Sequence, residues 1–195
     1  MDLDDELDKS YQSSLEDWSQ ALEAGQVDNN THTGRVVKLA LALAKKLGLS
    51  PQETADLRRG MLVHDIGVMA IPDTILFKPG NYSPEEFAVV KQHVRFGYDM
   101  LSPLRSSPGT LDIVRYHHER WDGSGYLEGL RGVEIPLLAR VAAIIEVWDG
   151  TTSDRPNRVA WSREQARQYL LDQSGKMFDP QIVGVFIAML DETSG

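Results

Sequence analysis

The chain has 195 residues, of which 42% are hydrophobic and 25% charged, a composition typical of a globular protein long enough to bury one core. It has no cysteine, which excludes disulfides, thiolate metal sites and cysteine nucleophiles and leaves histidine and carboxylate as metal ligands. The formal net charge of −9 disfavours broad contact with DNA or anionic lipid, because both bind through clustered Lys and Arg.

The N-terminal segment carries apolar side chains at helical spacing, namely Leu7, Tyr11, Leu15, Trp18 and Leu22. This spacing predicts a separate N-terminal helix in residues 1–25, which either packs on the rest or pairs with a second copy or with a sensory or receiver domain. The acidic start lacks the features of a signal peptide, and no apolar run approaches the roughly 18 residues of a membrane span. We therefore expect a cytoplasmic protein with no membrane partner.

Helix signals predict an all-α fold for the chain, a bundle with about seven or eight helices, whose main domain covers residues 26–195. Three segments have the pattern of a capping box, and they begin at Ser50, Ser83 and Ser162. Gly48 is expected to end one helix, and Asp179-Pro180 to open the last. No pair of alternating runs joined by Asn-Gly or Asp-Gly occurs, so a substantial sheet is not expected.

The five histidines form one pattern with nearby carboxylates, and they are His32, His64, His93, His117 and His118. Asp65 follows His64 in a predicted helix over 57–68, where adjacent side chains diverge by about 100°, so both serve one site only if several helices surround it. Asp28, one turn before His32, and Glu146, in a predicted helix over 137–149, are further candidates. A single histidine in a helix is usually an ordinary hydrogen-bonded residue, but the whole set favours a shared metal site.

The ordered motifs resemble the HD-GYP domain, a family of cyclic di-GMP phosphodiesterases built on the HD metal-dependent phosphohydrolase fold. The resemblance covers residues 11–190, nearly the whole chain, and implies a helical bundle of the HD-domain type. The motifs that carry it are Asp28-Asn29-Asn30-Thr31-His32, His64-Asp65-Ile66-Gly67, His93 with Gly97, His117-His118-Glu119-Arg120-Trp121-Asp122-Gly123-Ser124-Gly125-Tyr126, and Thr152-Ser153-Asp154-Arg155-Pro156.

The resemblance implies hydrolysis of cyclic di-GMP to pGpG, with GMP as an alternative end product. Asp65 and His64 would be catalytic, and Asp65 would bridge two cations. The implied metal ligands are Asp28, His32, His64, Asp65, His93, His117, His118 and Glu146. Two or three divalent transition metal ions would bind, with iron or manganese as the first choice and zinc or nickel as alternatives.

The resemblance also implies substrate contacts, and these are Tyr126, Arg155, Arg158, Asp122, Gly123 and Gly125. Tyr126 would contact a guanine nucleotide, and the two arginines would approach its phosphates, because guanidinium groups pair well with phosphate oxygens. The remaining three residues would shape the glycine-rich stretch 121–136. An alternative for Arg155 is an ion pair with Asp149 or Asp154. A diguanylate cyclase is a further expected partner.

Three departures from the family pattern leave alternatives open. Val68 stands where the family has a phosphate-contacting Lys, Leu127 replaces the Pro of Gly-Tyr-Pro, and Gly25-Gln26 replaces an Arg-Asp pair. One alternative is a weak or inactive module that binds cyclic di-GMP or a partner protein. Another is an HD hydrolase of a different nucleotide phosphate ester. The intact histidines favour catalysis, and Tyr126 with its loop favours the cyclic dinucleotide.

Overall fold

The structure is a computed structural model that describes residues 32–104, 106–154 and 159–192. The predicted N-terminal helix in residues 1–25 lies outside the described residues, and so do Asp28, Arg155 and Arg158. Their predicted roles therefore remain predictions.

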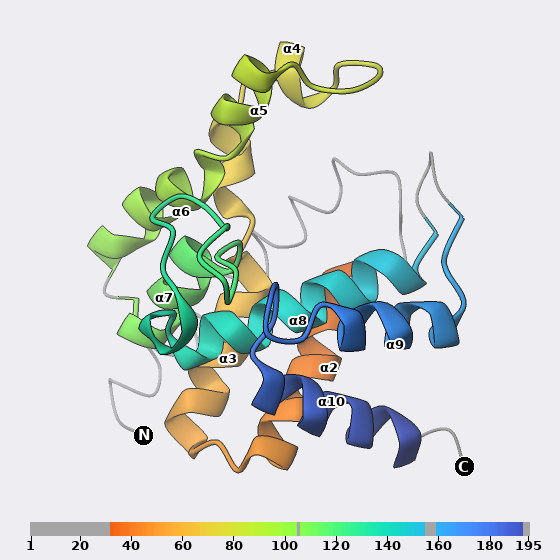
Figure 1. Ribbon diagram of the computed structural model, residues 1–195. Coiled ribbons are helices and arrows are strands. Elements are labelled where there is room, and N and C mark those ends of the chain that lie inside the picture. The colour runs from red at the N-terminus through yellow and green to blue at the C-terminus, as the bar shows by residue number, and fades with distance from the viewer. Residues whose placement is uncertain (1–31, 105, 155–158, 193–195) are drawn as a thin grey trace.

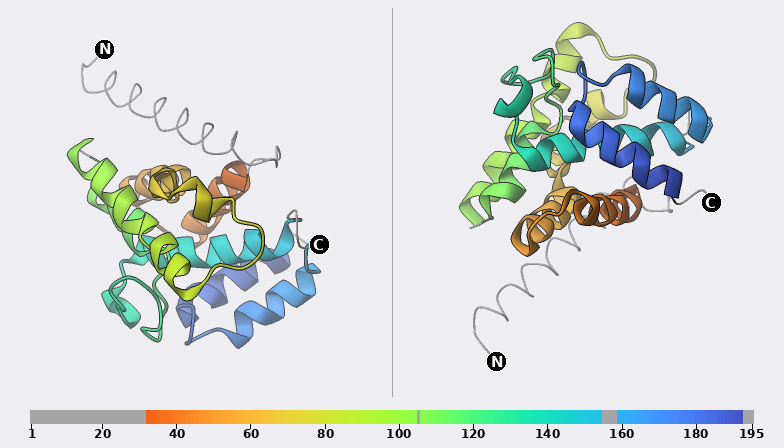
Figure 2. Two further views of the ribbon diagram at one scale, coloured as in Figure 1. Left: turned by 90° about the horizontal axis from the view of Figure 1, so that it is seen from above. Right: turned by 60° about the horizontal axis from the view of Figure 1, so that its bottom comes forward.

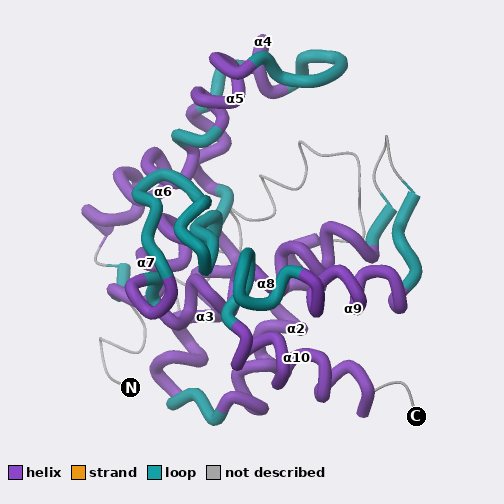
Figure 3. The backbone as a smooth tube through the Cα atoms, in the orientation of Figure 1, coloured by secondary structure: helices purple, strands orange, loops and turns teal. Residues whose placement is uncertain are grey.

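The described residues form a helical bundle without a β-strand, which confirms the predicted all-α fold (Figures 1 and 3). The α-helices are α2 (His32–Leu47), α3 (Pro51–Val63), α4 (Asp73–Leu76), α5 (Pro84–Val90), α6 (His93–Leu101), α7 (Pro108–Tyr116), α8 (Leu137–Thr152), α9 (Arg163–Asp172) and α10 (Pro180–Glu192). Short 3-10 helices are η1 (Ile66–Ala70), η2 (Ser102–Leu104) and η3 (Gly132–Glu134). Apart from the single turn α4, eight described helices match the expected seven or eight. None of the described helices has both the length and the apolar character that crossing a bilayer requires.

The predicted helix signals act as expected in the structure. The hydroxyls of Ser50, Ser83 and Ser162 each accept a hydrogen bond from the backbone N–H three residues later, and each forms a complete capping box. Gly48 follows α2 with φ 67°, a left-handed conformation that favours glycine at the end of a helix. Asp179 accepts a hydrogen bond from the first turn of α10 at 2.8 Å. Local sequence therefore fixes where these helices begin and end.

Helix α8 is the central element of the bundle. It contacts α2, α3, α7, α9 and α10, and it lies between the α2 and α3 pair on one side and the α9 and α10 pair on the other (Figure 2). Its consecutive apolar residues, including Ile144 and Ile145, are fully buried, and burial of each such side chain contributes about 1.5–3 kcal/mol. Trp148 packs edge to face on Phe186 of α10, with ring centroids 5.7 Å apart. Because α8 is surrounded, a polar residue on it is brought into the interior.

The helix expected over residues 57–68 is shorter than predicted. Helix α3 ends at Val63, His64 is its C-cap, and Asp65 has φ −97° and ψ 10° before η1 begins. The divergence of about 100° expected for neighbours on one helix therefore does not apply. The break allows His64 Nε2 and Asp65 Oδ2 to lie 3.4 Å apart.

Glycine 67 allows η1 to pack directly on α6. A Cβ atom at Gly67 would lie 1.9 Å from the His93 carbonyl oxygen and 2.4 Å from the Gly97 backbone nitrogen. No side chain fits into that space without moving α6. The close approach of the two backbones is therefore what places His93 beside Asp65. Helices α4 and α5 project beyond the body of the bundle at this end (Figure 1).

We predict that Gly67→Ala lowers the free energy of unfolding by about 1–3 kcal/mol, because the added methyl group overpacks a backbone contact. The matched control is Gly184→Ala on the exposed face of α10, where a Cβ meets nothing within 4 Å. Gly184→Ala should raise the free energy of unfolding by about 0.5–1 kcal/mol. Urea unfolding of the metal-free variants, followed by circular dichroism, measures both. Equal effects of the two substitutions would contradict the packing described.

Candidate metal centre

Two groups of side chains converge where α2, α3, α6, α7 and α8 meet, and the potential ligand atoms within each group lie within 4.8 Å of one another. The first group holds Asp65, His93, His117 and His118. The second holds His32, His64 and Glu146. Every predicted metal ligand among the described residues is therefore in one of these groups, and Asp28 lies outside those residues.

Asp65 connects the two groups. Its Oδ1 lies 3.3 Å from His93 Nε2 and 3.6 Å from His117 Nε2, both in the first group. Its Oδ2 lies 3.4 Å from His64 Nε2 in the second. Glu146 closes the second group, with its two oxygens 3.2 Å from His64 Nε2 and 3.4 Å from His32 Nε2. A carboxylate with one oxygen directed at each group has the geometry for bridging two cations.

Backbone hydrogen bonds aim three imidazoles into the centre. His64, His93 and His117 each donate Nδ1–H to a carbonyl oxygen three or four residues earlier, over 3.0, 2.9 and 2.9 Å. This fixes the tautomer and leaves Nε2 with a free lone pair. These three Nε2 atoms and Glu146 Oε1 are buried and have no hydrogen-bond partner. Buried polar atoms without partners are costly, and a divalent cation in each group would satisfy them. The residues therefore fit metal ions.

His32 is oriented by a carboxylate instead of a carbonyl. Its Nδ1 lies 2.7 Å from Oδ2 of the buried Asp149, and Arg35 binds the same carboxylate at both oxygens, over 2.6 and 2.9 Å. The sequence motifs did not predict this role for either residue. The signal was present in the spacing, because Arg35 follows His32 by three residues and Asp149 follows Glu146 by three, which places each pair on one helix face.

The two groups differ in protonation when no metal is bound. Burial opposes a charge on His32, but hydrogen bonds with Asp149 and Glu146 outweigh it and raise its pKa to about 9. Burial, with the neighbouring His117, lowers the pKa of His118 to about 2. Burial also lowers the pKa of His117. At neutral pH His32 therefore carries a proton, whereas His117 and His118 are neutral and can accept a cation directly.

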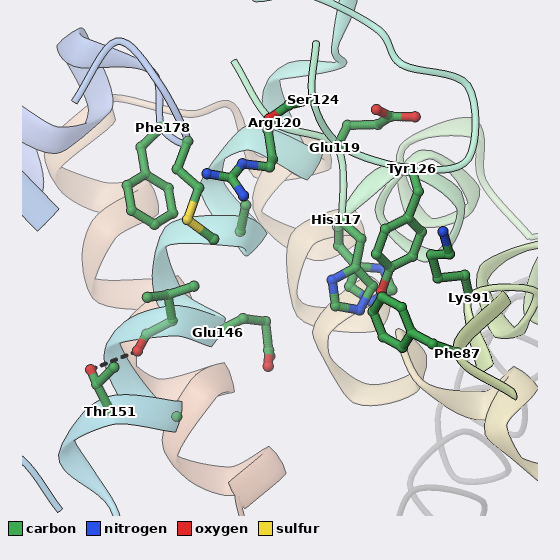
Figure 4. Close-up of a pocket in the computed structure, with 16 residues that line it drawn as sticks. Phe87, Lys91, His117, Glu119, Arg120, Ser124, Tyr126, Glu146, Thr151 and Phe178 are labelled. Carbon is green, nitrogen blue, oxygen red and sulfur yellow. Dashed lines mark hydrogen bonds between the residues drawn. The ribbon is translucent and has the colours of Figure 1, made fainter. Parts of the chain in front are cut away.

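A cavity of about 580 Å³ opens beside the ligands, which puts His117, His118 and Glu146 on its wall. Figure 4 shows Tyr126, Phe87 and Lys91 grouped beside His117, with Arg120 and Phe178 across the cavity. A volume of this size lies in the range of small-molecule and nucleotide pockets. A ligand in this cavity would contact the metal centre and both of these walls.

The predicted substrate residues divide between the cavity and the loop behind it. Tyr126 and Gly125 line the cavity. One face of the Tyr126 ring stacks on His118, with centroids 4.8 Å apart and planes at 26°, so a base does not stack on that face. Asp122 does not line the cavity and binds Ser124 at 2.9 Å. Gly123 has φ 79° and lies against Arg131. Their roles in substrate binding remain predictions.

Glu119 holds the loop that carries Tyr126, a role that we did not predict. Its side chain is 3% exposed, and Oε1 accepts hydrogen bonds from the backbone N–H groups of Glu128 and Gly129, at 2.7 and 3.0 Å. Arg115 pairs with the Glu128 carboxylate on the outer side. A Cβ at Gly125 would lie 2.5 Å from Glu119 Cα, so the loop is packed tightly on its own start. A Glu in a glycine-rich loop has no spacing pattern that would have revealed this contact.

Fold and site together define a class, an all-α protein in which two adjacent groups of histidine and carboxylate side chains could hold metal ions. The HD domain family matches residues 17–182, and the chain belongs to this family. The resemblance to the HD-GYP group, inferred from the motifs, is confirmed by its relatives and structural neighbours.

Two relatives and one solved structure illustrate the similarity. The chain is 37% identical over 196 residues to the cyclic di-GMP phosphodiesterase response regulator RpfG of Xanthomonas campestris pv. campestris, covering 97% of this chain and 52% of RpfG. It is 36% identical to the 3'3'-cGAMP-specific phosphodiesterase 2 of Vibrio cholerae serotype O1, covering 88% of this chain and 33% of that protein. Bd1817, an HDG"Y"P protein from Bdellovibrio bacteriovorus, matches with a TM-score of 0.66 and 26% identity, covering 84% of this chain and 55% of that one. The chain thus spans about half the length of RpfG and a third of the V. cholerae enzyme.

We predict that acid releases a metal ion from the group of His32 first. Protonated His32 stabilises the metal-free fold below its ordinary pKa of 6.5, and this contribution is lost as pH rises through about 9. A metal ion requires the neutral form, so affinity at His32 should fall as pH drops below about 9, while His117 and His118 still bind. Metal release to a colorimetric chelator across a pH series measures the order. The wild type and His32→Ala are compared over the same pH series. If the ion held by His117 and His118 is released at a higher pH than the ion held by His32, the prediction is contradicted.

Proposed function

We propose that the chain is a metal-dependent phosphodiesterase that opens cyclic di-GMP to the linear dinucleotide pGpG. The observation that carries the proposal is the pair of ligand groups that share Asp65 and border a cavity of about 580 Å³. Two adjacent cations on such a carboxylate suit in-line displacement at phosphorus. The choice of cyclic di-GMP is supported by the relative RpfG, which is named for that substrate.

The proposed cofactors are two divalent ions, one at each ligand group, with Asp28 available for a third. Iron or manganese is the first choice, because the donors are nitrogen and oxygen, and zinc or nickel are the alternatives. When bound, such ions supply a water acidic enough to attack phosphorus near neutral pH and positive charge for the phosphate oxygens.

The chain's own residues position the metal ligands and supply a hydrogen-bond donor to the substrate. Asp65 and His64 hold the middle of the centre, and the Asp149 and Arg35 pair keeps His32 turned toward it. Burial raises the pKa of Tyr126, so its phenol stays protonated and can donate a hydrogen bond to a substrate oxygen. No Ser, Cys or Lys nucleophile is needed for this reaction.

A hybrid cyclic dinucleotide is the second candidate substrate. The relative from V. cholerae is named for 3'3'-cGAMP and is nearly as similar to this chain as RpfG. Both substrates are cyclic purine dinucleotides with two phosphodiester bonds, so the same cavity and centre suit either.

The binding-only alternative has less support from the site. Val68 is half-buried in η1, and Leu127 is 38% exposed and lies at a second cavity, so neither departure is on the wall of the cavity beside the metal centre. Diguanylate cyclase as a partner and the cytoplasmic location stay predictions.

We predict that the purified chain, loaded with Fe(II) under anaerobic conditions or with Mn(II), releases pGpG from cyclic di-GMP. Asp65→Asn should lower turnover by at least about 100-fold, since even residues behind the ligands commonly contribute 10–100-fold. Ion-exchange chromatography of the nucleotides measures the release of pGpG by the wild type and by Asp65→Asn.

Val68→Lys is the companion variant in the same assay. Activity in the wild type confirms an enzyme. Activity only in Val68→Lys identifies a nucleotide-binding module, and turnover of 3'3'-cGAMP alone reassigns the substrate. A chain that retains no transition metal contradicts the proposal altogether.

A further inference from the structure

Two cationic side chains line the cavity without a carboxylate partner. Lys91 is the C-cap of α5 and lies two residues before His93. Arg120 follows His118 by two residues. In the described part of the chain, no Asp or Glu oxygen forms a salt bridge with either. Nearby arginines differ, because Arg115 pairs with Glu128 and Arg140 pairs with Asp179. Lys91 and Arg120 are therefore cations on the cavity wall that no described salt bridge engages.

Lys91 is held in the cavity by two aromatic rings. Its Nζ lies 5.3 Å from the centroid of Phe87 and 5.7 Å from that of Tyr126, within cation–π range of both. The rings are edge to face, 6.4 Å apart. These contacts keep the ammonium group beside the cavity, half-buried, instead of extended into bulk water.

Arg120 occupies the other wall. It lies with Met177 and Phe178 across from Lys91 (Figure 4). Its Nε is buried and has no hydrogen-bond partner among the described residues. The guanidinium group as a whole lines the cavity, and such a group is suited to a phosphate oxygen, which accepts charge-assisted hydrogen bonds.

The negative charge of the chain explains why an anionic ligand would need both Lys91 and Arg120. The chain has a net charge of −9, and Asp65 and Glu146 add negative charge beside the cavity. A ligand with two phosphate groups can place only one of them at the metal centre. The other needs cations from the protein walls, because burial of an unpaired charge is strongly unfavourable.

We propose that Lys91 and Arg120 are phosphate-binding side chains of this cavity, one on each side of the metal ligands. The ligand class is a compact diester with two phosphate groups. The inference rests on the proposed function for the metal centre but assigns residues that the motifs did not indicate. Neither residue takes part in the bond-breaking step, so both act through binding.

The test uses Lys91→Met and Arg120→Met in the metal-loaded chain, with cyclic di-GMP and 3'3'-cGAMP as probes. Each variant should raise KM about 10- to 100-fold and change kcat less, as expected for loss of a hydrogen bond to a charged group. Calorimetric binding of cyclic di-GMP to the metal-free chain gives an independent Kd, which should weaken likewise and lose part of its salt dependence. Lys91→Arg should restore most of the affinity.

Lys45→Met is the matched control, because Lys45 is exposed in the last turn of α2, away from the cavity. Metal content after loading checks that each variant keeps the centre intact. If the wild type acts on cyclic di-GMP while both cavity variants keep KM and Kd within twofold, the inference is overturned and the proposed function stands. If only 3'3'-cGAMP is bound or cleaved, with the same losses, the inference stands and the cyclic di-GMP assignment fails. A wild type that binds and cleaves neither overturns both.

Discussion

The constraint on which the structure depends is the convergence of imidazoles and carboxylates at one point, where three imidazole nitrogens and one carboxylate oxygen are buried without a hydrogen-bond partner. His64 is the C-cap of α3, His93 opens α6, and His117 is the C-cap of α7, so helix ends converge there while α8 passes alongside with Glu146. Backbone carbonyls take the Nδ1 protons and leave the Nε2 atoms facing inward. Without cations this arrangement is costly, because unsatisfied polar atoms and like charges meet in the interior. The helix bundle therefore brings together ligand groups that metal ions could complete.

Electrostatics divides the centre into unequal halves. Hydrogen bonds with Asp149 and Glu146 hold a proton on His32, whereas burial keeps His117 and His118 neutral. Asp65 belongs to both, so protonation in one half affects the other through a single carboxylate. Charge is also unevenly distributed on the walls of the cavity. Aromatic rings, a lysine and an arginine line the cavity beside Glu146, which places positive charge next to a carboxylate in a chain of net charge −9.

Sequence reasoning predicts best where a local rule decides the structure. Capping boxes at Ser50, Ser83 and Ser162 follow from hydrogen bonds within four residues, and the structure has each of them. The candidate metal ligands could be proposed because histidines are few and lie in ordered motifs, and the structure brings the described ones together. The break after Val63 was missed, because it depends on the approach of η1 to α6. Glu119 and Lys91 were missed for the same reason, since their partners lie on loops and helices that only the tertiary fold brings together.

The central claim is that Asp65 joins two cation sites. Anomalous X-ray diffraction from crystals of the metal-loaded chain, recorded at the absorption edge of the bound metal, tests this most directly. The account predicts two neighbouring peaks, one among Asp65, His93, His117 and His118 and one among His32, His64 and Glu146, with a separate oxygen of Asp65 facing each. A single peak that excludes Asp65, or ions bound only elsewhere on the chain, would contradict it.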